Sequence, residues 1–181
     1  MRLLSCCFVA AAAIAPFVCS AASPYSGEQS RSIKSLSKQD VADYIDGKGM
    51  GFAKAAELNG YPGPAHVLEL ADKLALTPAQ KARTEELFGR MQMRARELGV
   101  RLIEEERRLD ELFASKTVSH QSLATAVSSI AAIQSELRAT HLQAHLDQTA
   151  ILNAAQKAEY SQLRGYADAN PHLHHRHTTA K

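Results

Sequence analysis

Two long stretches with regularly spaced apolar residues, joined by a short break, most constrain how this chain can fold. The first stretch forms one seam at alternating steps of four and three: Met91, Ala95, Leu98, Leu102, Glu105, Leu109 and Leu112. The second carries a similar seam: Leu123, Val127, Ile130, Ile133, Leu137, His141 and Ala144. Such spacing is typical of helices packed as in a coiled coil. Because the break at 116–119 is short, the chain is predicted to be all-α, with a long antiparallel helical hairpin.

The same helix-start signal occurs at both ends of this hairpin. At 76–80 the sequence reads Leu-Thr-Pro-Ala-Gln, in which Thr77 suits the N-cap and Gln80 the reciprocal position of a capping box. At 152–156 it reads Leu-Asn-Ala-Ala-Gln, with Asn153 as the cap. We therefore expect one helix-entry device at each end, and a short closing helix that extends to about Tyr166.

The segment before the hairpin predicts short helices and turns. Residues 23–36 are Ser-rich and polar, which indicates a flexible lead-in. Short helices are expected over 38–46, 49–58 and 65–74, with the proline turn 61–64 before the last of them. The glycine-rich segment 47–51 lacks the Lys-Ser signature and the strand context of a phosphate loop, and its role stays open.

The first 22 residues have the features of a cleavable signal peptide. A positive start is followed by the apolar run 8–18 and by small residues at 20–22. An uncleaved anchor is one alternative, and a lipoprotein formed through Cys19 is another, although Val18 suits lipidation poorly. All three cysteines (Cys6, Cys7 and Cys19) lie in this segment, so the processed protein is expected to be exported and to have no disulfide or thiol chemistry.

Composition and motifs exclude several classes of function. The formal net charge is only +2, and the charged residues of the first long stretch read as a solvated face, so no nucleic-acid partner is expected. Aromatic residues make up only 6%, which suits a thin helical bundle. The sequence shows no nucleophile–base constellation and no His-Glu-x-x-His motif, so we predict that the chain is not an enzyme.

Histidines provide the candidate site. His141 and His145 are four residues apart, so they share one helix face and could bind one metal ion together. Alternatively, His141 is a core or dimer-interface residue and His145 a surface residue. If the turn is centred near residue 117, His145 should lie opposite about Arg90 on the antiparallel helix. Glu85 and Glu86 should then lie within about one helical turn of the histidines. The tail 169–181, expected to be disordered, holds four more histidines that could gather metal loosely or form a polar end.

Over residues 60–166 these features resemble the Spy/CpxP superfamily of periplasmic, LTxxQ-type helical proteins. The resemblance rests on the two helix-start signals around a hairpin, with Asn153 in place of the usual Thr. It implies a periplasmic protein whose domain, here 60–168, pairs as a homodimer with a curved cradle. The family includes envelope-stress chaperones and a ZraP/CnrX-like branch of heavy-metal resistance and sensor proteins.

Carried over from the sensors, the resemblance implies a metal site made of His66, Glu86, His141 and His145. Such nitrogen and oxygen ligands suit zinc, nickel, cobalt or copper(II). Leu70 stands where sensors often have a second histidine, and Glu69 could substitute for it. The choice between Glu85 and Glu86 stays open, and His66 could instead cap a helix.

Two functions are therefore expected. The first is a periplasmic metal-responsive protein of the heavy-metal resistance or sensor type, which could act with a membrane signalling partner. The alternative is an envelope-stress chaperone that holds unfolded periplasmic proteins, with Met91 and Met93 as candidate contacts unless they pack in the core or dimer interface.

Overall fold

The computed structural model describes residues 23–166, which fall into two compact units divided after Ser30. The described part of the first unit contains the short 3-10 helix η1 (Glu28–Ser30). The second unit contains six helices in its described residues: α1 (Lys38–Asp46), α2 (Lys54–Glu57), α3 (Pro64–Glu69), α4 (Pro78–Ala114), α5 (His120–Ile151) and α6 (Ala154–Leu163). Every regular element in this part of the chain is helical, as predicted. The predicted signal peptide and histidine tail lie outside the described residues.

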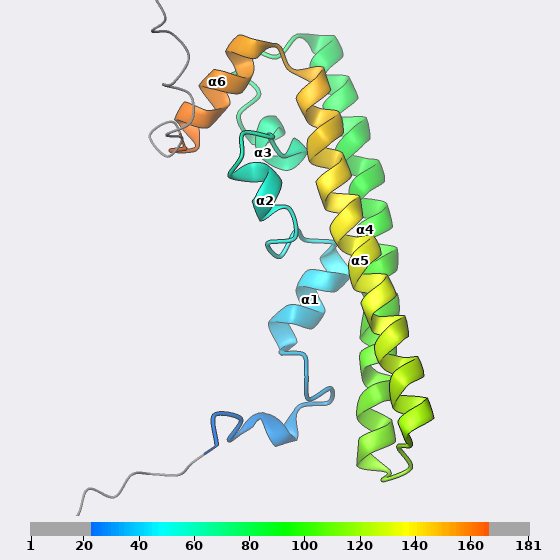
Figure 1. Cartoon of the computed structure of the whole chain (residues 1–181). Coiled ribbons are helices and arrows are strands. Elements are labelled where there is room, and N and C mark those ends of the chain that lie inside the picture. The colour runs from blue at the N-terminus through cyan, green and yellow to red at the C-terminus, as the bar shows by residue number, and fades with distance from the viewer. Residues whose placement is uncertain (1–22, 167–181) are drawn as a thin grey trace, which may run out of the picture. The chain divides into compact units, whose positions relative to one another are not determined.

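Helices α4 and α5 form the long antiparallel hairpin (Figure 1). The middle of its seam is an apolar cluster of buried side chains: Ala95, Leu98, Leu102, Ile130, Ile133 and Leu137. One seam position was wrong, because Ala126 is buried while Val127 is exposed. The register also differs from the prediction, since Arg94 pairs with Glu136 at 2.6 Å rather than lying level with residue 141. The two helices are therefore displaced by about one turn from the expected alignment.

The base of the hairpin, where α4 begins and α5 ends, is joined by the two predicted capping boxes. Thr77 and Asn153 each cap their helix through the backbone N–H three residues on. The two box glutamines also bond to each other, since Gln80 Nε2 donates to Gln156 Oε1 at 2.8 Å. In addition, Gln80 Nε2 donates to the Ile151 carbonyl at 3.0 Å, and Gln156 Nε2 to the Leu74 carbonyl at 3.2 Å. The repeated signal thus forms one hydrogen-bonded unit.

The short helices pack beside the hairpin (Figure 1). Helix α1 contacts α4, α2 contacts α5, and α3 contacts both. Helix α1 crosses α4 so closely that a Cβ added at Gly99 would lie 2.2 Å from the Tyr44 carbonyl oxygen. At the base, a second buried cluster joins Val67 of α3 and Tyr160 of α6 to Leu74 and Leu152, which lie in the connections before α4 and α6.

Part of the predicted flexible lead-in is docked on α4. Ile33 is buried, and Lys34 forms an ion pair with Asp110 at 3.2 Å. Ser35 donates a hydrogen bond to Glu106 at 2.7 Å. A single apolar side chain with two polar contacts fixes this segment, although its overall composition is that of a loop.

Candidate metal pocket

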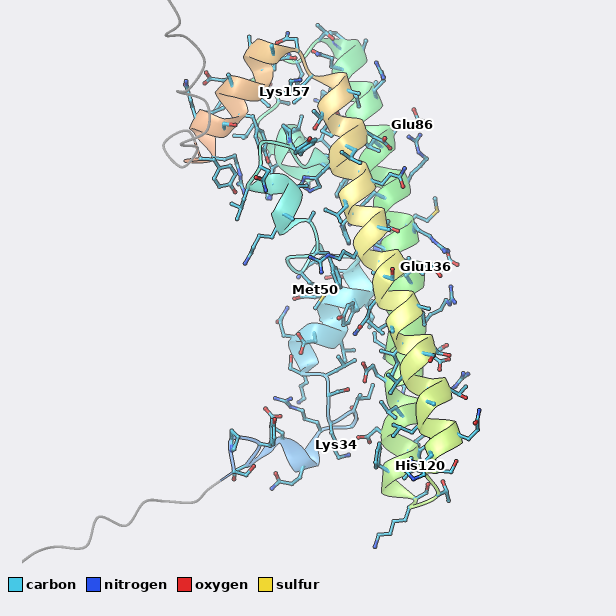
Figure 2. The ribbon with its side chains drawn as sticks, in the orientation of Figure 1. Lys34, Met50, Glu86, His120, Glu136 and Lys157 are labelled. Atoms are coloured by element: carbon cyan, nitrogen blue, oxygen red, sulfur yellow. The ribbon has the colours of Figure 1, made fainter. Side chains whose placement is uncertain are left out.

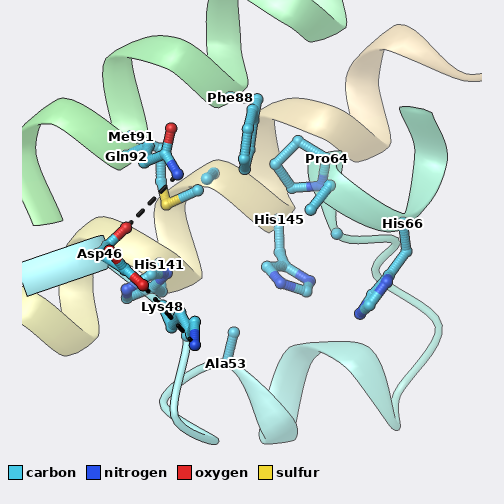
Figure 3. Close-up of a pocket in the computed structure, with 15 residues that line it drawn as sticks. Asp46, Lys48, Ala53, Pro64, His66, Phe88, Met91, Gln92, His141 and His145 are labelled. Atoms are coloured by element: carbon cyan, nitrogen blue, oxygen red, sulfur yellow. Dashed lines mark hydrogen bonds and ion pairs between the residues drawn. The ribbon is translucent and has the colours of Figure 1, made fainter. Parts of the chain in front are cut away.

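A cavity of about 280 Å³ lies between the hairpin, α3 and the glycine-rich segment that precedes α2. Three of the four predicted ligands, His66, His141 and His145, line it, and Figure 3 shows His145 between the other two. Helix α5 contributes His141 and His145 one turn apart, α3 contributes His66, and α4 contributes Phe88, Met91 and Gln92. The fold thus brings His66, which only the resemblance linked to the site, to the same pocket as the pair that the sequence grouped by spacing.

His141 is the most buried of the three. It is 5% exposed, and its ring stacks on Phe52 with 6.0 Å between centroids. Its Nε2 is buried and has no hydrogen-bond partner among the described residues. Burial lowers the pKa of His141 below its usual 6.5, and the neighbouring His145 lowers it further. Burial therefore favours the neutral imidazole, in a side chain that is among those lining the pocket.

His145 is oriented by the turn that precedes α3. Its Nδ1 lies 2.8 Å from the Tyr61 carbonyl oxygen, which can only accept, so Nδ1 carries the proton and Nε2 keeps its lone pair. The side chain is 13% exposed, which differs from the alternative of a simple surface residue. A carbonyl that fixes the tautomer in this way is a common feature of histidines that bind metals.

His66 is more loosely held. Its side chain is 39% exposed, and Nδ1 pairs with Glu69 Oε2 at 3.0 Å on the same helix. It does not cap α3, whose N-cap is Gly63. His66 therefore lines the pocket while pairing with the acidic residue that the sequence analysis considered as a substitute ligand.

The structure does not bring Glu86 to the histidines. Its carboxylate is 70% exposed and forms an ion pair with Arg90 on the same helix. Figure 2 shows Glu86 on the side of the hairpin away from α2 and α3. Phe88, which lines the pocket, is two residues later and so points about 200° around the helix. Glu85 is exposed as well. The register estimated from the sequence placed Glu86 at about the right position along the hairpin. It could not show which face of α4 the side chain occupies.

Glu57 is the acidic residue that lies near His145. Its Oε2 is 3.7 Å from His145 Nδ1, and its side chain is 12% exposed. Its Oε1 accepts a hydrogen bond from the Tyr160 hydroxyl at 2.6 Å and lies 3.3 Å from Arg164 Nε. Burial and this bond raise the pKa of Tyr160. Sequence reasoning missed Glu57, because α2 is a single turn with no periodic pattern and its partners lie on distant α6.

As arranged, residues 23–166 contain no group of three or more His, Cys, Asp or Glu side chains close enough to hold a metal ion. The same residues contain no helix that is long and apolar enough to cross a membrane. Comparisons with protein-family models, curated proteins and solved structures found no match to this chain.

Proposed function

We propose that this chain is a periplasmic metal-responsive protein of the heavy-metal resistance or sensor type, which binds a divalent transition metal ion in the histidine-lined pocket. The observation that carries the proposal is the pairing of two unused ring nitrogens on one face of α5. His141 Nε2 is buried and has no hydrogen-bond partner among residues 23–166, and in a neutral His145 ring the proton on Nδ1 leaves the lone pair on Nε2. A buried polar atom without a partner is costly, and in the tautomer that has its lone pair on His141 Nε2 a bound cation would satisfy that atom.

The chemistry of the pocket defines the class of ion. Neutral imidazoles suit zinc, nickel, cobalt or copper(II), and no cysteine lies outside the first 22 residues to select a softer metal. His66 would join these ligands by giving up its contact with Glu69 and binding the ion instead. Its side chain is exposed, so it has room to rotate. In this proposal, binding draws α3 toward α5. The protein acts by binding rather than by catalysis, as a homodimer, and it is exported by its signal peptide.

Isothermal titration tests the proposal. The four tail histidines (His172, His174, His175 and His177) are first replaced by alanine, so that only the folded unit reports. We expect stoichiometric binding, at micromolar affinity or tighter, of at least one of Zn²⁺, Ni²⁺, Co²⁺ and Cu²⁺. Binding should be lost in the double variant His141→Ala, His145→Ala. The matched control is His120→Ala, at the far end of α5, which should bind as the parent does. Absence of binding in the parent would refute the proposal.

A second candidate function is the holding of unfolded periplasmic proteins. The observation in its favour is a set of large apolar side chains exposed on the two long helices: Met93, Val100, Val127 and Leu146. Scattered apolar side chains among charges can contact a client weakly. The test is light scattering of a reduced, aggregating client protein with and without this protein. Suppression that is weakened by Met93→Ser together with Val100→Ser, in the absence of metal, would favour this function.

A further inference from the structure

The two carboxylate oxygens of Glu57 have different contacts, and within residues 23–166 Oε2 has only the 3.7 Å approach to His145 Nδ1. Oε1 accepts from the Tyr160 hydroxyl and pairs with Arg164, whereas Oε2 is buried and has no hydrogen-bond partner among the described residues. Desolvating a carboxylate oxygen without a partner costs free energy, and the contacts on Oε1 hold it in that position. A bound cation would satisfy such an oxygen.

The unused oxygen and the unused nitrogen of His145 face the same small space. Gly63 borders it: a Cβ added there would lie 3.0 Å from His145 Nε2 and 3.5 Å from Glu57 Oε2. The backbone φ of Gly63 is −85°, so the chain conformation itself does not require glycine. What the missing side chain allows at this position is the close approach of the His145 ring, because a Cβ would lie only 2.8 Å from its Cε1.

His66 borders the same region. A hollow of about 390 Å³ is lined by Glu57, His66 and His145, together with the glycine-rich segment. It adjoins the pocket described above, since His66 and His145 line both. Two imidazoles and one carboxylate are a set that zinc and related ions accept, at about 2.0–2.2 Å to each ligand atom. Closing to such distances needs a rotation of His66 away from Glu69, which its exposure permits.

We propose that Glu57 is the carboxylate ligand of the metal site, with Tyr160 and Arg164 as the positioning residues that aim its free oxygen past Gly63 toward the metal. This inference rests on the proposed function and adds a ligand from α2, held by α6. It replaces Glu86, which lies on another face of α4. It also couples the metal to α6, because Tyr160 lies in the second half of that helix and Arg164 is its C-cap residue.

The experiment compares two variants that remove the same charge. In the chain with alanines at the tail histidines, Glu57→Gln and Glu86→Gln are titrated with the tightest of the four ions. We expect Glu57→Gln to bind ~100-fold more weakly or worse, and Glu86→Gln to bind as the parent does. Circular dichroism without metal reports whether each variant is folded. Tyr160→Phe, which keeps Glu57 but removes its hydroxyl partner, is expected to bind ~10-fold more weakly.

Parental affinity in folded Glu57→Gln overturns this inference and leaves the histidine site in place. If Glu57→Gln does not fold, parental affinity in Tyr160→Phe overturns it instead. A loss of affinity in Glu86→Gln alone would return the carboxylate to α4 and likewise overturn it. A parent chain that binds none of the ions refutes the proposed function itself, which is a distinct result.

Discussion

The middle and the base of the hairpin solve the same packing problem in different ways. In the middle, every member of the buried cluster is apolar. At the base, the buried residues include polar side chains: Thr84, His141, Gln148 and Gln156. The buried polar atoms without a hydrogen-bond partner in the described region, on Glu57, His141, Gln148 and Arg164, also lie toward the base. Apolar packing between two helices is sufficient in the middle, whereas the base depends on hydrogen bonds from segments far apart in sequence.

The largest effect is expected from a cavity in the apolar middle. Leu98 is fully buried at 0% exposure, so Leu98→Ala should lower the free energy of unfolding by about 2–5 kcal/mol. Urea denaturation followed by circular dichroism measures the change. Val100→Ala is the matched control, because Val100 is exposed on the same helix and should change stability by less than ~0.5 kcal/mol. Equal effects at the two positions would show that the seam is not the core.

A smaller but coupled effect is expected at the base. Gln80→Ala and Gln156→Ala each remove the two hydrogen bonds between the glutamines and the other bonds of the replaced side chain, so each should cost about 1–3 kcal/mol. The double variant should cost clearly less than the sum of the two, with a coupling of about 0.5–3 kcal/mol. Denaturation of all four proteins closes the cycle. Simple additivity would mean that the two capping boxes act separately.

This comparison also explains what could be predicted from the sequence. The seam and the caps depend on spacing within one helix, so the hairpin and both capping boxes were predictable, whereas the Val127 seam position and the register between the two long helices were wrong. The contact between Gln80 and Gln156 could not be read from either copy alone, since it forms across the fold. Glu86 and Glu57 differ for the same reason. A register estimate gives height along a helix but not direction, and Glu57 is positioned by Tyr160 and Arg164, about a hundred residues later.

The next effect depends on pH. It is measured with His141→Leu, which replaces a buried polar side chain at the base by an apolar one. Burial lowers the folded-state pKa of His141 below the unfolded value of 6.5. The unfolded chain therefore takes up the proton first as pH falls. Without metal, this residue's contribution to stability should be constant above about pH 6.5 and decline below it toward the folded pKa, by at most about 1.4 kcal/mol per pH unit.

His141→Leu should remove that decline and leave the protein more stable than the parent at low pH. The readout is the difference in unfolding free energy between the parent and His141→Leu across this pH range. Contributions from the other histidines are common to both proteins and cancel in that difference. A difference that does not change with pH would show that His141 is not desolvated, and that the base is less distinct from the middle than described.

The smallest expected effect compares the N-cap of α5, at the tip of the hairpin, with the N-cap of α6, at its base. At the tip, Ser119 Oγ accepts from the Ser122 N–H at 3.1 Å in an exposed turn. At the base, Asn153 Oδ1 accepts from the Gln156 N–H at 2.9 Å, and Gln156 is also bonded to Gln80. Replacing Ser119 by alanine should cost about 0.5–1 kcal/mol, as for an isolated cap.

Asn153→Ala should cost more, about 1–2 kcal/mol, because loss of the cap also loosens the side chain of Gln156. The extra cost of Asn153→Ala over Ser119→Ala should vanish when each is made in a Gln80→Ala background. In that background no glutamine pair remains to be disturbed. Thermal unfolding of the single and combined variants supplies the comparison. If the excess persists in that background, the base cap is stronger for local reasons alone, and the interlocked glutamines add nothing to it.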